Sequence, residues 1–286
     1  MPPLTAPADE LAALTEGRAA VGLHTFHTVH VAGADARRWL HDLITTDVAS
    51  LRPGEARRSL LLDPTGHIRA DLQVACDHDG FWLFQAPDAG SDVAAALAPY
   101  VLSSDVDLDD RTGRRRLMAL PGSQAATGGF APSCVGSGVD VLLDEGASTP
   151  PDGRMLVGDD AAEVWRIRYG RARMGVDFDE TSIPAEAALE ATIDATKGCF
   201  LGQESVARVR NLGHPPRVVL HLRADAPVEP GARVATADGA EVGSVTSAAV
   251  SDGGGTVVLA SIRWGSRSGP LGTSDGVRLV PVGSLD

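Results

Sequence analysis

The sequence of 286 residues is poor in aromatic side chains, poor in cysteine and without an excess of basic charge. Lysine and arginine number 25 against 38 aspartate and glutamate residues, so the formal net charge is −13 at pH 7. Such a balance argues against direct binding of nucleic acid, whose phosphates attract a basic surface. The three cysteines, Cys76, Cys134 and Cys199, are odd in number and far apart. We therefore expect no disulfide framework and a reducing compartment.

Signals for membrane insertion or export are also missing. Residues 1–10 have neither a basic start nor the apolar stretch of a secretory signal. No stretch approaches the roughly 18 uninterrupted apolar residues of a membrane-spanning helix. We expect a cytoplasmic protein with no membrane partner, long enough for two domains or one large one.

Strand and helix patterns alternate over the first part of the chain, which favours an α+β body. The Asp-Pro-Thr-Gly segment at 63–66 is typical of a turn between strands. Alternating apolar and polar residues predict a further strand at 162–169. The remaining elements expected here are strands at 26–31, 58–62, 68–76 and 81–85 and helices at 36–44 and 91–97.

The second half of the chain predicts a different architecture. The stretch 123–151 is rich in Gly, Ser, Ala and Pro, so it is either a linker or a second subdomain with short strands such as 139–143. After Pro216 only strand patterns remain, at 217–222, 233–237, 241–245 and 256–264, with an Asp-Gly hairpin turn at 238–239. We predict an α+β body over 1–213, with the layout of 115–160 left open, and a small β-barrel over 214–286.

The segment most informative about chemistry runs over 197–213. Gly198 and Gly202 are expected to bracket a sharp loop at positive φ, and a helix should begin near Gln203. Cys199 would lie just before the start of that helix and two residues after Lys197. Both features favour the thiolate, the reactive form of cysteine.

The alternative interpretation is that Cys199 is a small buried hydrophobe, as most lone cysteines are. Cys76 ends an apolar strand and Cys134 lies in the Gly/Ser-rich stretch, so both are expected to be inert.

The window 197–223 is net basic within an acidic protein. It could receive an anionic ligand tail or an acidic partner surface, although charge alone favours an ordinary solvated helix face. Glu204 would complement the helix dipole in the first turn and could pair with Arg208, four residues later. A metal site at His24, His27 and His30 is not expected, because a strand would place His27 on the face opposite the other two.

Residues 197–204, Lys-Gly-Cys-Phe-Leu-Gly-Gln-Glu followed by Val-Ala-Arg, resemble the signature of the YgfZ family, folate-binding relatives of the T-protein GcvT of the glycine cleavage system. Phe200 is the one departure, since the family has tyrosine there. The segments 33–48 and 63–72, Ile183-Pro184 and the C-terminal strands are also similar to the family, whereas 115–160 is unmatched.

The resemblance implies a GcvT/YgfZ-like α+β multi-domain body around a central folate cavity, with a small C-terminal β-barrel. It also implies tetrahydrofolate or a derivative as cofactor, and a role in assembling or repairing iron–sulfur proteins, including enzymes that thiolate tRNA. The expected partners are folate and iron–sulfur client or assembly proteins. The implied catalytic residues are Cys199, Lys197 and Asp71, and the implied cofactor-binding residues are Phe26, Trp165, Gly198, Gly202, Gln203, Glu204 and Arg208.

Two departures from T-proteins keep other functions open. The Asp-Asp pair of T-proteins reads Ala70-Asp71 here, and Arg168 stands where T-proteins carry a glutamate that holds the pterin. A guanidinium is donor-only and cannot accept from the pterin's N–H groups. The alternatives to an accessory factor are a folate-dependent aminomethyl or methyl transferase or demethylase of the T-protein type, and a non-catalytic scaffold.

Overall fold

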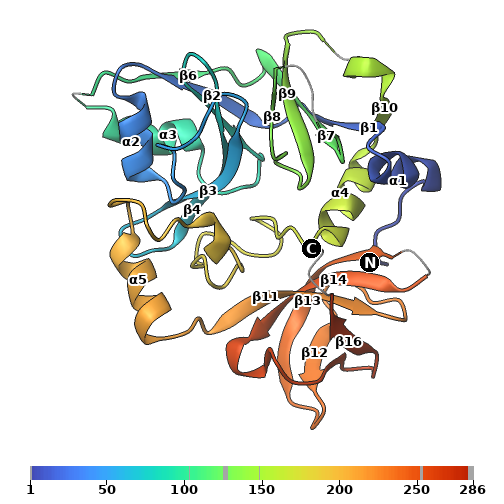
Figure 1. Cartoon of the computed structure of the whole chain (residues 1–286). Coiled ribbons are helices and arrows are strands. Elements are labelled where there is room, and N and C mark those ends of the chain that lie inside the picture. The colour runs from blue at the N-terminus through green and yellow to red at the C-terminus, as the bar shows by residue number, and fades with distance from the viewer. Residues whose placement is uncertain (1, 103, 125–127, 148, 252–253, 283–286) are drawn as a thin grey trace.

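Figure 1 shows the computed structural model of the chain, which describes residues 2–102, 104–124, 128–147, 149–251 and 254–282. Its strands form two open five-stranded sheets and a closed six-stranded barrel. The α+β class and the C-terminal barrel are confirmed. No helix in the described part of the chain is long and apolar enough to cross a membrane.

The first sheet is antiparallel, with strand order β3-β4-β5-β2-β6. Alternation along β4 divides its side chains between two environments: Leu72 and Val74 pack under two helices, whereas Asp71 and Gln73 lie on the opposite face. The predicted elements of this region are all present. They are β2 (His27–Ala32), β3 (Ala56–Leu62), β4 (Ile68–Cys76) and β5 (Phe81–Gln85), with α2 (Ala36–Leu43) and α3 (Val93–Leu97). The edge strand β6 (Asp107–Asp110) was not predicted.

The second sheet has the order β10-β1-β7-β9-β8, and only the β1–β10 pair is parallel. It takes up much of the stretch that the sequence left open as linker or subdomain, so 123–151 contributes to a subdomain. Its strands are β1 (Ala19–Leu23), β7 (Arg115–Pro121), β8 (Gly129–Phe130), β9 (Gly138–Asp144) and β10 (Met155–Val157), preceded by α1 (Ala8–Thr15).

The strand predicted at 162–169 is wrong, because this segment belongs to helix α4 (Asp159–Arg168). Ala161, Val164 and Ile167 are buried at a spacing of three residues, which fits a helix, and Asp159 and Asp160 lie in its first turn. Residues 165–169 alternate apolar and basic side chains like a strand, but Arg166 is buried in an ion-pair network and does not mark an exposed face. In Figure 1, α4 lies between the second sheet and the barrel.

The barrel closes in the order β11-β14-β13-β12-β15-β16 around an apolar core. The boundary predicted at 213/214 stays a prediction, since Val219 and Leu259 of the barrel pack with Leu60 and Phe200 of the body. The barrel strands are β11 (Arg217–Ala224), β12 (Arg233–Thr236), β13 (Glu241–Val250), β14 (Thr256–Arg263), β15 (Leu271–Thr273) and β16 (Arg278–Pro281).

Between α4 and the barrel the chain is largely irregular until α5 (Gln203–Leu212), which Figure 1 shows at the edge of the molecule, away from α4. The helix predicted to begin near Gln203 is thus confirmed. Short 3-10 helices occur at Ala98–Tyr100, Pro151–Gly153, Glu190–Thr192 and Trp264–Ser266.

Candidate functional site

A cavity of about 430 Å³, called the central cavity below, lies where the first sheet, the β1–β2 turn and α4 meet. Asp71 and Gln73 enter it from β4, on the sheet face opposite α2 and α3. Phe26 enters from the β1–β2 turn, and Glu163 from α4. The cavity therefore draws its walls from segments that are far apart in the sequence.

Asp71 does not offer a free carboxylate to this cavity. Arg58 on the neighbouring strand β3 forms a bidentate pair with it, Nε to Oδ1 at 2.8 Å and Nη2 to Oδ2 at 2.5 Å. Both side chains are only 12% exposed, and Arg58 also donates to the carbonyl of Ala172. Bidentate guanidinium–carboxylate pairs are strong and hold a fixed geometry. The catalytic role predicted for Asp71 would require this pair to open.

The two aromatic residues predicted to bind the cofactor are placed differently. Phe26 lines the cavity and is half-buried. Trp165 belongs to the same apolar cluster as Phe26, but it does not line the cavity, and its ring lies 5.5 Å from that of Tyr169. The structure thus places only Phe26 where it could stack on a ligand.

The carboxylate that T-proteins use to hold a pterin has no direct substitute at Arg168. The Arg168 guanidinium turns to the barrel, where it donates to the carbonyl of Val250 at 2.7 and 3.0 Å. Arg168 does not line the cavity, and its correspondence to the pterin-holding glutamate stays a prediction. Glu163, one turn earlier on α4, lines the cavity but is paired with Arg166 and Arg173.

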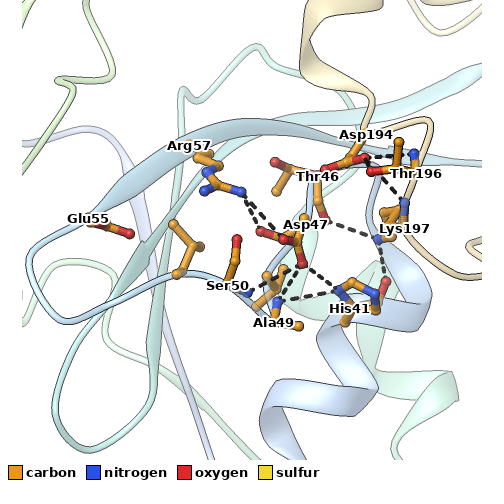
Figure 2. Close-up of polar contacts among 12 residues, drawn as sticks. His41, Thr46, Asp47, Ala49, Ser50, Glu55, Arg57, Asp194, Thr196 and Lys197 are labelled. Atoms are coloured by element: carbon orange, nitrogen blue, oxygen red, sulfur yellow. Dashed lines mark hydrogen bonds and ion pairs between the residues drawn. The ribbon is translucent and has the colours of Figure 1, made fainter.

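Lys197 of the signature segment performs an anchoring role at the end of α2. Its ammonium donates to the carbonyls of His41, Ile44 (2.5 Å) and Thr46 (3.0 Å). Figure 2 shows the contacts with His41 and Thr46. These acceptors surround the C-terminal end of the helix, where a cation is favoured. Burial lowers the pKa of Lys197 to about 8. Since α2 covers the sheet face opposite Asp71, Lys197 is directed away from the cavity.

The segment before Lys197 is tied to the same place by reciprocal hydrogen bonds. Thr45 donates through Oγ1 to the carbonyl of Thr192 at 3.0 Å and accepts at its own carbonyl from the N–H of Asp194. Nearby, burial alone would raise the pKa of Asp47, but hydrogen bonds from Ser50 and Ala49 hold it below its usual value. Figure 2 shows Asp47 beside the lysine anchor. Two sequence motifs about 150 residues apart thus form one polar joint.

The start of α5 is pressed against the tip of the β3–β4 hairpin. Gly202 has φ of 81°, and a Cβ there would lie 2.5 Å from the carbonyl oxygen of Asp63. Gly66 at the tip is equally close to Ser205 of α5, with a Cβ position 2.7 Å from the serine Cβ. The expectation of positive φ is confirmed for Gly202 and wrong for Gly198, which has open space around its Cβ position.

Cys199 is exposed, whereas Cys76 and Cys134 are buried, and all three are free thiols. The interpretation of Cys199 as a buried hydrophobe is therefore wrong. Figure 1 separates α5, which follows Cys199, from α4 at the cavity wall. The signature residues at 197–204 and Arg208 do not line the central cavity.

The other signature residues make local contacts. Gln203 accepts through Oε1 from the N–H of Phe200 at 3.4 Å. Glu204 and Arg208 are exposed on α5, and in the described residues they do not form the predicted pair. Val206 and Val209 instead line a separate hollow of about 580 Å³ beside Trp264 of the barrel. The structure thus groups the predicted site residues in two places: Phe26 and Asp71 at the cavity, and the signature segment at α5.

The cavity residues that the sequence analysis missed include Arg58, Gln73, Glu163 and Arg171. The period of two in a strand could have found Gln73, which shares a face with Asp71. Arg58 and Glu163 face the cavity through ion pairs, and Arg171 lies outside the regular elements, so local patterns did not predict them.

The three histidines near the β1–β2 turn have separate surroundings. His24 lines the cavity, His27 lies 3.2 Å from Asp92, and His30 packs on Trp82 with ring centroids 4.6 Å apart. Across the described residues, no group of three or more His, Cys, Asp or Glu side chains is placed to hold a metal ion.

Residues 4–127 match the family model described as the GCVT N-terminal domain. In fold, the whole chain is similar to the glycine cleavage system aminomethyltransferase T of Bartonella henselae, with a TM-score of 0.79 at 22% identity over 99% of this chain and 91% of that one. The fold is GcvT-like. The likeness to the solved structure concerns the fold alone.

Among curated relatives, the GcvT-like chain is 24% identical over 275 residues to the chloroplastic "Putative transferase" of Arabidopsis thaliana, covering 84% of this chain but only 63% of that protein. It is 26% identical over 246 residues to an "Uncharacterized protein" of Haemophilus influenzae, covering 82% of this chain and 85% of that one. The chain therefore spans less than two thirds of the plant relative.

Proposed function

We propose that this GcvT-like protein binds a reduced folate in the central cavity and presents Cys199 as a working thiol, as an accessory factor in the assembly or repair of iron–sulfur proteins. The observation that carries the proposal is the placement of Cys199. It is an exposed thiol in a loop that Lys197 fixes to α2, outside the cavity. A rigidly mounted thiol at the surface suits contact with another protein.

The residues of the central cavity fit a folate. Its volume of about 430 Å³ lies within the range of small-molecule sites. Phe26 offers an aromatic face, and Gln73 is 2% exposed with an Oε1 that accepts no hydrogen bond in the described structure. A buried acceptor without a donor is costly, and the amino and ring N–H groups of a pterin would satisfy it. When bound, the folate would supply a carrier for one-carbon groups.

The second candidate is a transferase or demethylase of the T-protein type. Asp71 favours it, because this carboxylate does line the cavity. The Arg58–Asp71 pair weighs against it, since Arg58 occupies both oxygens of the carboxylate. The scaffold alternative predicts a filled cavity, so the open cavity weighs against a vestigial site.

The proposal places the protein in the cytoplasm with iron–sulfur client or assembly proteins as partners, such as tRNA-thiolating enzymes, and with neither nucleic acid nor membrane as a direct partner. The three free thiols support a reducing compartment.

The test combines anaerobic titration calorimetry with an assay of a tRNA-thiolating iron–sulfur enzyme in cells that lack this protein. Wild type and Cys199→Ala should both bind tetrahydrofolate and folinic acid, and only wild type should restore the enzyme. Cys76→Ala, a buried thiol, is the control and should restore it. Full restoration by Cys199→Ala would overturn the role of the thiol. Absence of folate binding by wild type would overturn the folate assignment. Tetrahydrofolate-dependent turnover of an aminomethyl or N-methyl donor, lost in Asp71→Asn, would establish the T-protein alternative.

A further inference from the structure

Among the residues that the structure describes, no carboxylate pairs with the guanidinium of Arg171 in the central cavity. Arg171, three residues after α4 ends, lines the cavity beside Arg58, Arg166 and Arg173. Each of those three has a carboxylate partner, Asp71 for Arg58, Asp177 and Glu163 for Arg166, and Glu163 for Arg173. Over the described residues, the Arg171 side chain makes no hydrogen bond and no ion pair.

The two carboxylates whose charges act on Arg171, Asp71 and Asp140, do not pair with it, and Asp71 is already paired with Arg58. Asp140 of β9 is fully buried, and its two oxygens are taken by the Ser133 hydroxyl at 2.5 Å and the Cys134 N–H at 2.7 Å. Burial lowers the pKa of Arg171 to about 10, and the nearby charge of Arg58 acts in the same direction. Arg171 therefore stays protonated at neutral pH as a cation without a direct counter-ion.

The nitrogens of Arg171 face open volume. In the described residues, sealed side-chain polar atoms without partners include Gln73 Oε1 and Arg173 Nε, but none from Arg171. Since Arg171 lines the cavity and lacks a protein partner, its N–H groups are directed at the space that a ligand would fill. A guanidinium carries five N–H donors in a planar fork that matches a carboxylate.

We infer that Arg171 is the anion anchor of the central cavity, and that the molecule bound there presents a carboxylate to it. This inference rests on the proposed function only in taking the cavity as the binding site. The carboxylate has two sources with the same chemistry: the glutamate of the folate itself, or a small amino acid bound beside the pterin. In both cases the pair would form inside a low-dielectric site, where a charge-assisted hydrogen bond is strong.

The experiment compares wild type with Arg171→Met and Arg171→Lys by anaerobic calorimetry. The probes are tetrahydrofolate, 6-methyltetrahydropterin (which has no carboxylate), and N-methylglycine with and without the pterin. Arg233→Met, on the barrel surface, is the matched control and should bind as wild type does. Because Arg171 has no partner in the protein, Arg171→Met should leave the melting temperature unchanged or raise it.

If the anion belongs to the folate, Arg171→Met weakens tetrahydrofolate binding about tenfold or more and leaves 6-methyltetrahydropterin unaffected. If it belongs to an amino acid, tetrahydrofolate binding is unchanged and binding of N-methylglycine is lost. Arg171→Lys should retain part of the affinity, since it keeps the charge without the fork.

Equal binding of every probe by wild type and Arg171→Met would overturn the inference while leaving the folate proposal intact. Wild type that binds N-methylglycine but no folate, with that binding lost in Arg171→Met, would support the anion anchor and refute the folate proposal. Wild type that binds no probe would overturn both.

Discussion

Asp140 is a carboxyl group with 0% exposure between the second sheet and the central cavity. Burial raises its pKa to about 6, against the donated hydrogen bonds from Ser133 and Cys134, which would lower it. In the unfolded chain the same group titrates near 3.8. Between these values the folded protein binds more protons than the unfolded chain.

We therefore expect the protein to lose stability as the pH rises through the pKa of Asp140 in the folded state. The contribution of protonated Asp140 to the free energy of unfolding is fully present below pH 3.8 and is lost as the pH rises to about 6. A pKa shift of this size corresponds to about 3 kcal/mol. Urea denaturation of wild type and Asp140→Asn at a series of pH values measures it. The free energy of unfolding of wild type relative to Asp140→Asn should fall between pH 4 and pH 6. Parallel pH profiles for the two proteins would contradict the assignment.

At the level of residues, the sequence was a better guide to which side chains belong to the candidate site than to the contacts those side chains make. Phe26 and Asp71 were predicted for the site and do line the cavity, and Cys199 is exposed as a reactive thiol requires. Lys197 was predicted as a neighbour that activates Cys199, but its ammonium is held by three carbonyls of the α2 region. Partners that lie some 150 residues away leave no trace in local spacing.

At the level of elements, the conformation of the loop before α5 requires a glycine at one of its two glycine positions and not at the other. Gly202 adopts φ of 81° and has the Asp63 carbonyl 2.5 Å from its Cβ position, whereas Gly198 has nothing within 4 Å. The two residues share one sequence motif, so they form a matched pair for substitution.

Gly202→Ala should lower the free energy of unfolding by about 2–3 kcal/mol, because the new methyl group clashes with backbone and the φ angle is strained. Gly198→Ala should change it by about 0.5 kcal/mol or less. Chemical denaturation of both variants checks the difference. Equal losses would mean that the contact between the α5 loop and the β3–β4 hairpin does not stabilise the protein.

Many of the regular elements were predicted from the sequence, and the misses have different causes. The strands β2 to β5 and the strands β11 to β14 follow turn signals and a period of two, and all were predicted. In α4 the sequence alternates apolar and charged residues and was read with the period of a strand. Arg166 is nevertheless buried, because it pairs with Asp177. The short strands β8 and β10, of 2 and 3 residues, are too brief for a pattern to show.

For the molecule as a whole, a buried polar network joins α4 to the barrel. Asp177 has a side chain with 0% exposure, pairs with Arg166 at 2.7 Å, and accepts from the hydroxyls of Thr246 and Ser247 of β13. Arg166 also donates to Ser247 at 2.9 Å. This network fixes the barrel against the wall of the cavity.

Arg166→Met should lower the free energy of unfolding by about 3–5 kcal/mol, because Asp177 is left buried and unpaired. Arg233→Gln is the control, since its ion pair with Glu241 is exposed and should contribute about 0.5 kcal/mol or less. Denaturant unfolding measures both. In an Asp177→Asn background the effect of Arg166→Met should shrink, and equal effects in the two backgrounds would contradict the coupling.

Leu4, near the start of the sequence, is hydrogen-bonded to the C-terminal barrel, which is synthesised last. Leu4 pairs with the barrel strand β13: its N–H donates to the carbonyl of Ala248 at 2.9 Å, and its own carbonyl accepts from Val250 at 2.9 Å. During synthesis Leu4 leaves the ribosome long before β13 exists, so this contact can close only after the barrel has emerged. The pairing of Leu4 with β13 is therefore among the last to form during synthesis. A protein fused ahead of Leu4 would have to leave this segment free to pair with β13.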